Sequence, residues 1–198
     1  MQPQVEELIN EVPLLLTNLS YSLLRQFAAL ILSYLFAIPY GIVAARCRRA
    51  ESVMLPILDI LQSVPILGFF PVAVLFFITI FGGSRLGVEL AAIFLIFTSQ
   101  AWNLAFSTYE SVSATPNELF EVSKAFKLGM VGRIMKLYLP SCVPKLVYNG
   151  MMSWAGGWYF LVAAEIITIG SEEYRVPGIG SYIAEATYAG DLSTLFSG

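Results

Sequence analysis

Long apolar stretches alternate with short polar or basic segments along this chain, a pattern typical of proteins that cross a membrane several times. A helix needs about 20 apolar residues to cross a hydrocarbon core about 30 Å thick. Four stretches meet or approach this length: Leu19–Leu24 together with Phe27–Ala45, Val64–Phe81, Leu86–Phe106 and Leu146–Ile169. The pattern predicts an all-α polytopic membrane helical bundle with about four spans, forming one domain over residues 1–198.

The second stretch, Val64–Phe81, is interrupted by Pro65, Gly68 and Pro71. We expect the preceding segment, Val53–Gln62, to lie at the membrane interface. A proline removes a backbone donor and interrupts helical hydrogen bonds. Breaks at membrane depth are tolerated where the backbone is buried in protein or lines a cavity. Two interpretations of these prolines remain open: a kinked helix that simply packs against its neighbours, or a bend near a gate. We favour the bend.

A polar and basic insert, residues 115–144, separates the third and fourth spans and reads TPNELFEVSKAFKLGMVGRIMKLYLPSCVP. Thr115 and Glu118 have the spacing of a capping box, in which each side chain bonds a free backbone N–H of the first helical turn. Pro116 then occupies the first helical position, where its missing N–H costs nothing. These residues predict the start of a short helix.

The end of this helix and a second helix are also predicted from the insert. The first helix is expected to run to about Leu128, with Gly129 in the left-handed conformation that ends helices. A second helix is expected over Val131–Leu139 and to end at Pro140. The insert is therefore predicted to be two short helices joined by a glycine.

The first predicted helix of the insert is amphipathic. Glu121 and Lys124 lie one turn apart on its polar side. Two interpretations remain open on spacing alone: a helix pair that rests on anionic lipid through its lysines, or a docking site for a soluble partner. Its apolar face consists of Leu119, Val122, Ala125 and Phe126.

The positions of the basic residues predict the orientation, because cytoplasmic loops retain lysine and arginine. Arg85 and Arg175 fall on the opposite side, with Arg25 near the membrane edge. With four spans, Met1 and Gly198 are then both expected outside. Eight of the 11 basic residues lie in the first loop or in and just after the insert: Arg46, Arg48, Arg49, Lys124, Lys127, Arg133, Lys136 and Lys145.

Composition supports a membrane protein and excludes several kinds of site. Hydrophobic residues make up 57% and charged residues 13%, with a mean hydropathy of +0.73. The net charge of −3 suggests no nucleic-acid partner. The absence of histidine excludes histidine-based triads, metal sites and proton relays. Cys47 and Cys142 are expected to be free thiols, and Met1–Asn18 shows no cleavable signal peptide, since it is acidic.

The insert carries a motif that resembles the EAA loop of ABC-importer permeases, the inner-membrane components of binding-protein-dependent transport. Glu121 is followed by Val122 and Ser123, where that family has two alanines. Leu139 and Pro140 close the motif at the expected spacing. In that family a glycine stands six residues after the glutamate.

Here Lys127 occupies that glycine position, and a glycine follows at Gly129. The resemblance extends from about Leu19 to the C-terminus and favours the nitrate/sulfonate/taurine-type subfamily. The family usually has further spans, so we expect the chain to lack a flanking span at one or both ends. Three other segments carry the resemblance: Asp59–Pro65, Gly156–Trp158 leading to Ala164-Glu165, and Val176–Gly180.

The resemblance implies that the insert is a coupling loop that docks on a separate ATPase subunit. It implies three protein partners: this ATPase, a second permease subunit in a homo- or heterodimer, and an extracytoplasmic substrate-binding protein. It also implies a multi-pass location in the cell membrane, and a small anion such as nitrate, a sulfonate or taurine as substrate. No cofactor is expected in this chain, which lacks a nucleotide-binding P-loop motif, and ATP is used by the partner. The coupling residues are then Glu121, Val122, Ser123, Lys124, Ala125, Lys127, Gly129, Leu139 and Pro140.

Polar groups at membrane depth normally face a bundle interior or a water-filled cavity. Interhelical hydrogen bonding is at least as good an explanation for any single one of them. Asn149 and Glu165 are further polar candidates, and Glu165 is expected to pair with Arg25 or Arg175. The predicted pathway or gate residues are Gln62, Ser63, Pro65, Gln100, Asn103, Trp154 and Trp158.

Two other functions were weighed against transport by an importer. A membrane-embedded enzyme needs a nucleophile with a base, or an acidic metal site, and the sequence offers neither. A passive channel or a structural membrane subunit would work without ATP. The motif in the insert favours the importer permease over both.

Overall fold

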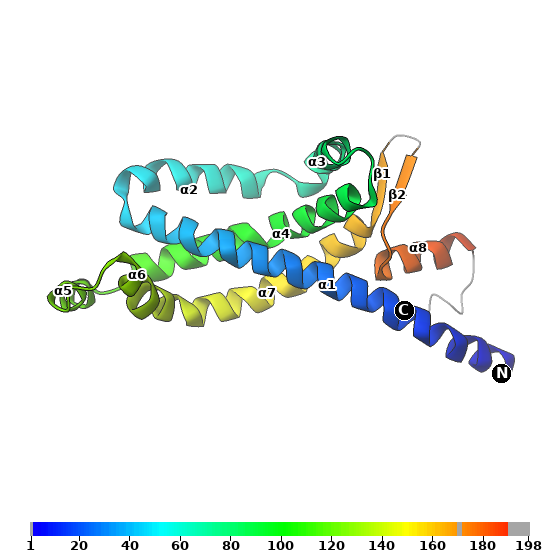
Figure 1. Ribbon diagram of the computed structural model, residues 1–198, viewed down its shortest axis with the longest axis horizontal. Coiled ribbons are helices and arrows are strands. Elements are labelled where there is room, and N and C mark those ends of the chain that lie inside the picture. The colour runs from blue at the N-terminus through cyan, green and yellow to red at the C-terminus, as the bar shows by residue number, and fades with distance from the viewer. Residues whose placement is uncertain (1, 170–171, 190–198) are drawn as a thin grey trace. The chain divides into compact units, whose positions relative to one another are not determined.

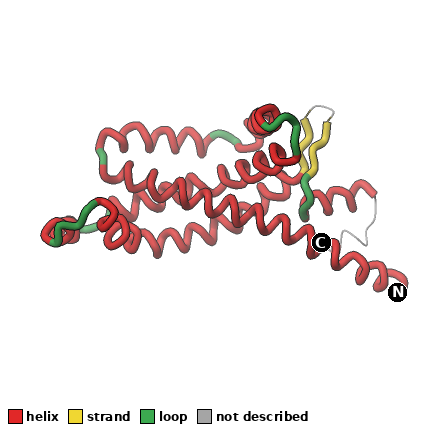
Figure 2. The backbone as a smooth tube through the Cα atoms, in the orientation of Figure 1, coloured by secondary structure: helices red, strands yellow, loops and turns green. Residues whose placement is uncertain are grey.

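The computed structural model describes residues 2–169 and 172–189 (Figure 1). The described part is nearly all helical, with one short β-hairpin (Figure 2). Met1 and Gly198, which the charge pattern places outside, lie beyond the described residues. The chain divides into two compact units, and the single domain over 1–198 stays a prediction. Unit 1 comprises Met1–Ala29, Ile66–Ser99 and Gly156–Gly198, and unit 2 comprises Leu30–Pro65 and Gln100–Ala155.

Three long helices contribute residues to both units. They are α1 (Gln2–Arg46), α4 (Arg85–Ser113) and α7 (Leu139–Glu165). Within the described residues, Val12–Arg46 and α4 are long and apolar enough to cross a membrane, and the helices on either side of Pro65 can make a third, broken span. The helix α7 has 27 residues but is less apolar than these. The predicted total of four spans therefore stays a prediction.

Unit 1 packs α3 (Ile66–Ile80) and parts of the three long helices around an apolar core. Small residues such as Ala29, Ala91 and Ala164 are fully buried in it, beside larger ones such as Leu95 and Leu161. Small residues allow helices to approach closely, which is how membrane helices associate. Two strands, β1 (Ile166–Ile169) and β2 (Glu172–Arg175), and the helix α8 (Ile179–Ala189) complete the unit.

The fourth predicted span ends earlier than the sequence suggested. It was expected to reach Ile169, but α7 ends at Glu165 and β1 begins at Ile166. The β-branched run from Ile166 to Ile169 favours a strand. The two strands pair antiparallel, with Ile166 opposite Arg175 and Ile169 opposite Glu172.

Unit 2 contains α2 (Arg48–Ser63), the remaining parts of the long helices and the insert. Its core includes Ala37, Leu58, Leu104 and Leu146. Within this unit α1 approaches α4 closely at Gly41, where an added Cβ would lie 2.5 Å from Thr108 Cβ. The insert folds into three short helical pieces: α5 (Asn117–Ala125), α6 (Met130–Arg133) and the π-helix η1 (Ile134–Tyr138).

The break predicted in the second apolar stretch is confirmed at Pro65, which lies between the end of α2 and the start of α3. Pro71 does not break the chain, since it lies inside α3. One proline removes one helical hydrogen bond, and the remaining bonds and packing keep the helix intact. Cys47 is exposed and Cys142 buried, and both are free thiols, as predicted.

Candidate functional site

The helix α5 is anchored to the rest of unit 2 by an aromatic cluster. Phe120 is buried, and its ring centroid lies 5.8 Å from that of Tyr138. The guanidinium carbon of Arg46, at the end of α1, lies 3.8 Å from the Phe120 centroid and 5.7 Å from that of Tyr138. A guanidinium over an aromatic face is a favourable cation–π contact. The end of α1 therefore holds α5 in place.

The opposite face of α5 is apolar and exposed. Leu119 is 46% exposed, Val122 50% and Phe126 75%. The sequence assigned these residues and Ala125 to one apolar face, and the structure leaves that face uncovered within the described chain. Glu121 and Lys124 form an exposed ion pair at 2.9 Å. Such a pair contributes little to stability in water, whereas the exposed apolar side chains mark a surface suited to a partner.

The predicted capping box is wrong. The Thr115 hydroxyl donates to the Ser111 carbonyl at 3.1 Å and lies 3.4 Å from the Ser141 hydroxyl, so it does not cap α5. Pro116 is the N-cap residue, with no side-chain hydrogen bond at the cap. Thr115 follows α4 closely enough for its hydroxyl to reach back four residues, a bond that competes with capping.

The left-handed residue after α5 is Lys127, not Gly129 as predicted. Lys127 has φ of +50°, whereas Gly129 has φ of −64° with an extended ψ of 175° and begins α6. The helix ends at Ala125 rather than Leu128, so the turn falls two residues earlier than expected. Lys127 is the position at which the family pattern has glycine, and its backbone conformation is the one that glycine adopts most easily.

Replacing Lys127 with glycine is therefore expected to stabilise the turn. The left-handed conformation costs a residue with a Cβ roughly 1–2 kcal/mol. Part of this gain is lost because glycine is more flexible in the unfolded chain. We expect a net increase of about 0.5–1 kcal/mol in the free energy of unfolding, measured by denaturation in detergent. The control variant is Gly129→Ala, whose added Cβ would contact nothing within 4 Å. Because Gly129 has a negative φ, this variant relieves no left-handed strain and should not show the stabilisation expected of Lys127→Gly.

The second predicted helix does not end at Pro140. The chain passes from α6 through η1 and continues as α7, which contains both Pro140 and Pro144. In η1 the Leu139 N–H donates to the Ile134 carbonyl, five residues back. Pro140 is the second residue of α7, and because it has no N–H it donates no bond to the π-helical turn η1 that directly precedes it. The motif end Leu139-Pro140 therefore starts a long helix.

The predicted coupling residues of the insert divide between exposed and buried positions. Ser123 is buried, and its hydroxyl donates to the Phe120 carbonyl at 2.7 Å. A small side chain at this position lets α5 lie close to the rest of unit 2. Most of the others face outwards, with Leu139 only partly covered: Glu121, Val122, Lys124, Ala125, Lys127, Gly129 and Pro140 are exposed.

The predicted pathway residues are divided between the two units. Gln62 and Ser63, at the end of α2, are exposed and bond locally to Asp59, and Pro65 is exposed beside them. The half-buried Trp154 belongs to unit 2 and Trp158 to unit 1, where Trp158 packs against the apolar core.

Asn103 and Gln100, on α4, differ in their surroundings within unit 2. The Asn103 amide donates to the Ser153 hydroxyl at 2.9 Å and to the Asn149 carbonyl at 3.4 Å, so it forms the interhelical bond that was weighed against pore lining. Gln100 is fully buried, and its amide nitrogen and oxygen have no hydrogen-bond partner among the described residues. A pathway role for these residues stays a prediction.

Unit 1 contains a buried ionic network centred on Glu165. The Arg25 guanidinium donates to Glu165 at 2.7 Å and, through two nitrogens, to Glu89 at 2.6 and 2.9 Å. The predicted pairing of Glu165 with Arg25 is thus confirmed. The Ser22 hydroxyl and the Gly180 N–H also donate to Glu165, at 2.5 and 2.6 Å. A carboxylate buried in an apolar unit requires such partners.

Glycines shape the surroundings of this carboxylate. A Cβ added at Gly178 would collide with the Glu165 carboxyl group, and one at Gly180 would lie 2.6 Å from the Val162 carbonyl oxygen. The sequence did not indicate that Glu89 or these glycines belong to the network, nor that Arg46, Phe120 and Tyr138 cluster. Each of these contacts joins different segments of the chain, so no pattern of neighbouring residues predicts it.

Comparison with curated proteins shows relatives at low identity. A bicarbonate transport system permease protein of Synechococcus elongatus is 26% identical over 175 residues, which are 86% of this chain and 58% of the relative. A nitrate import permease protein of Leptolyngbya laminosa is 28% identical over 177 residues, 89% and 58% of the two chains. A Bacillus subtilis protein named for aliphatic sulfonates transport is 26% identical over 181 residues, 91% and 60%. The chain spans about three fifths of the length of these relatives.

A solved structure and a family model extend the comparison. A chain of the methionine ABC transporter MetNI, in inward-facing conformations, superposes with a TM-score of 0.76 at 17% identity, covering 95% of this chain and 87% of that one. This likeness shows the fold alone and confirms the predicted all-α permease architecture. The model of the binding-protein-dependent transport system inner membrane component matches residues 37–197. The chain belongs to this family of ABC transporter permeases, as the motif in the insert predicted.

Proposed function

We propose that this chain forms the substrate pathway of an ABC importer and couples it to a separate ATPase subunit through α5. The observation that carries the proposal is the exposed apolar face of Leu119, Val122 and Phe126 on a helix that is firmly anchored from behind. A monomeric protein rarely exposes such a contiguous apolar surface without a partner. The aromatic residue of this face, Phe126 at the end of α5, is the kind of anchor on which interfaces depend.

The anchoring of α5 suits it to transmit motion. Coupling between distant sites requires packed elements with discrete arrangements. Phe120 is held between Arg46 and Tyr138, so a displacement of α5 would also move the aromatic cluster. The basic residues on this side support a cytoplasmic position under the positive-inside rule, where an ATPase would bind. We propose a multi-pass protein of the cell membrane on the same grounds.

The remaining partners and the substrate are proposals from the family. A second permease subunit would complete the pathway, and an extracytoplasmic binding protein would deliver the substrate. ATP would be used by the ATPase, and this chain would need no cofactor of its own. The relatives are named for bicarbonate, nitrate and aliphatic sulfonates, so we propose a small anion as substrate. Arg25 is already paired with two carboxylates, which favours the binding protein as the source of specificity.

Substituting aspartate for Phe126 tests the docking surface. A charge within this apolar contact should reduce recovery of the complex with the co-expressed ATPase about 30-fold, the effect of losing roughly 2 kcal/mol at an interface. Coupled ATPase activity should fall in parallel, because fewer complexes form. The measurement is the yield of complex after purification, followed by ATPase assays in reconstituted vesicles.

The control is Met135→Asp, the same kind of change at an exposed apolar residue of η1 outside α5. It should leave complex recovery near that of the unmodified chain. Equal recovery and equal activity for Phe126→Asp and the unmodified chain would exclude α5 as the coupling surface.

A further inference from the structure

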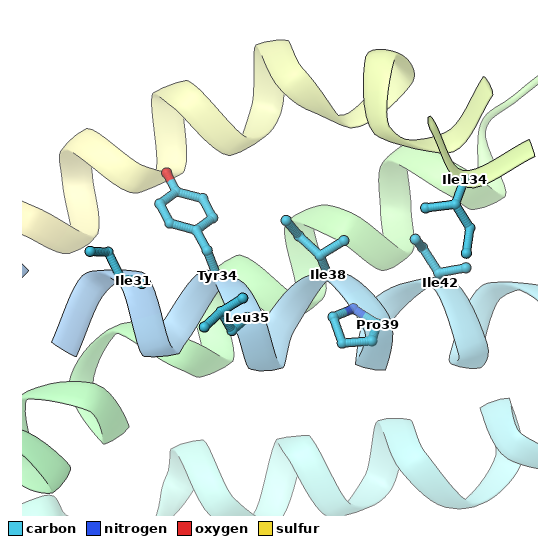
Figure 3. Close-up of a pocket in the computed structure, with 7 residues that line it drawn as sticks. All are labelled: Ile31, Tyr34, Leu35, Ile38, Pro39, Ile42 and Ile134. Atoms are coloured by element: carbon cyan, nitrogen blue, oxygen red, sulfur yellow. The ribbon is translucent and has the colours of Figure 1, made fainter. Parts of the chain in front are cut away.

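An apolar groove of about 490 Å³ runs along α1 within unit 2 (Figure 3). Ile31, Leu35, Ile38 and Pro39 line its length on α1. Ile134 of η1 reaches towards Ile42 at one end. The Tyr34 hydroxyl, the polar group of this groove, is directed to α7, where it donates to the Leu146 carbonyl at 2.9 Å. The surface that remains in the groove is almost entirely hydrocarbon.

A second cavity of about 550 Å³ continues from the Ile42 end of the groove. The two share Ile42 and Ile134 as lining residues. The second cavity is lined further by Arg46 and Arg133 and by the exposed Cys47. The apolar groove therefore continues into a cavity that is lined in part by two arginines from different segments of unit 2.

These two arginines have no anionic partner among the residues that the structure describes. Neither Arg46 nor Arg133 forms an ion pair within residues 2–169 and 172–189. The Arg133 Nε is buried and has no hydrogen-bond partner in the described part of the chain. Arg133 is half-buried and Arg46 exposed, so this end of the cavity carries positive charge that no carboxylate of the described residues balances. Two guanidinium groups select a phosphate, because their planar N–H donors match its oxygens.

We propose that the groove and the second cavity together bind one anionic phospholipid. Its acyl chain would lie along α1 from Ile42 to Ile31, and its phosphate would lie between Arg46 and Arg133. The 11 residue steps from Ile31 to Ile42 span roughly 16 Å of helix. This matches one leaflet of a hydrocarbon core about 30 Å thick. Basic pockets at the cytoplasmic side of membrane helices are known to bind such headgroups.

The combination of features distinguishes a lipid from the other occupants. A helix of a second copy of the chain would fill the apolar groove and leave the Arg133 Nε without a partner. Free phosphate would satisfy the arginines and leave the groove of Ile31, Leu35 and Ile38 empty. An anionic phospholipid satisfies both parts at once. The site shares Arg46 with the anchor of α5 but includes none of the exposed residues Leu119, Val122 and Phe126, and it does not depend on the proposed transport function.

The test uses the full chain in detergent, titrated with phosphatidylglycerol or phosphatidylcholine and followed by native mass spectrometry. One phosphatidylglycerol is expected per chain, with at least about fivefold preference over phosphatidylcholine, the factor expected for one arginine near an anionic headgroup. Arg133→Gln should lower the affinity for phosphatidylglycerol about fivefold and so remove its preference over phosphatidylcholine. Ile38→Trp should weaken the binding of both lipids, because the larger side chain fills the groove.

Matched controls separate lipid binding from general damage. Lys136→Gln removes a charge one turn away, at an exposed residue outside the lining of either cavity, and Leu32→Trp enlarges an exposed residue of α1 outside the groove. Both should bind phosphatidylglycerol as the unmodified chain does, with helical content checked by circular dichroism.

A second measurement needs no variant, because Cys142 is buried and Cys47 is the exposed thiol beside the arginines. Phosphatidylglycerol should slow maleimide labelling of Cys47 at a concentration about fivefold lower than phosphatidylcholine requires, whereas inorganic phosphate should not slow it. Equal binding of the two lipids, protection by inorganic phosphate alone, or a dimer cross-linked through the groove in place of bound lipid would overturn the proposal.

Discussion

Replacing Arg25 with leucine is expected to lower the free energy of unfolding by about 3–5 kcal/mol, the largest effect of any single change considered. Arg25 is 4% exposed and Glu165 is fully buried. Removing one member of a buried pair leaves the other charge uncompensated, which is the most damaging way to alter such a network. Glu89 would lose two hydrogen bonds at the same time. Thermal unfolding in detergent, followed by helical circular dichroism, measures the loss.

Two companion variants identify the origin of this loss. Glu89→Gln should cost only about 1–2 kcal/mol, because Glu89 is partly exposed and its amide replacement still accepts a hydrogen bond. Adding Glu165→Gln to Arg25→Leu should recover part of the stability, since the neutral amide needs no counter-charge. If Arg25→Leu unfolds at the same temperature as the unmodified chain, the network does not hold unit 1 together.

Replacing Gly41 with leucine is expected to cost about 3 kcal/mol by separating α1 from α4 in unit 2. The first added carbon would already lie 2.5 Å from Thr108 Cβ and 2.8 Å from the Ala105 carbonyl oxygen. Backbone atoms cannot move aside as a flexible side chain does, so the helices must shift. Overpacking of this kind typically costs 1–3 kcal/mol and occasionally more. The same thermal measurement applies.

Gly156→Leu is the control, because it makes the same substitution in another long helix. Gly156 is exposed, and a Cβ there would contact nothing within 4 Å. It should leave stability nearly unchanged or raise it slightly, since leucine favours helix more than glycine does. Equal destabilisation by both variants would assign the effect to the loss of glycine rather than to the contact between α1 and α4.

The features that the sequence predicted correctly are those fixed by strong physical constraints. A charge in an apolar span must find a partner, and Glu165 accordingly pairs with Arg25. A proline at the junction of two apolar segments ends a helix, and the chain breaks at Pro65. The family was predicted from the motif residues of the insert and is confirmed by the match over residues 37–197.

The wrong predictions fall where one local preference competes with another. Thr115 is a good capping residue, yet its hydroxyl reaches back to Ser111 because α4 runs on nearly to it. Gly129 is a good helix terminator, yet the turn is taken at Lys127, two residues earlier. The coupling and pathway roles lie beyond what spacing can decide, since they depend on surfaces that form only after α1, α4 and α7 have packed.

The contact between Arg46 and Phe120 has a mechanical consequence. It joins the last residue of the first long helix to the insert across the thickness of one aromatic ring. A displacement of α5 would therefore act directly on the end of α1, without passing through α2, α3 and α4. In such an arrangement α1 and α5 would move together, and the stiffness of the contact between Arg46 and Phe120 would determine how much of the movement of α5 reaches α1.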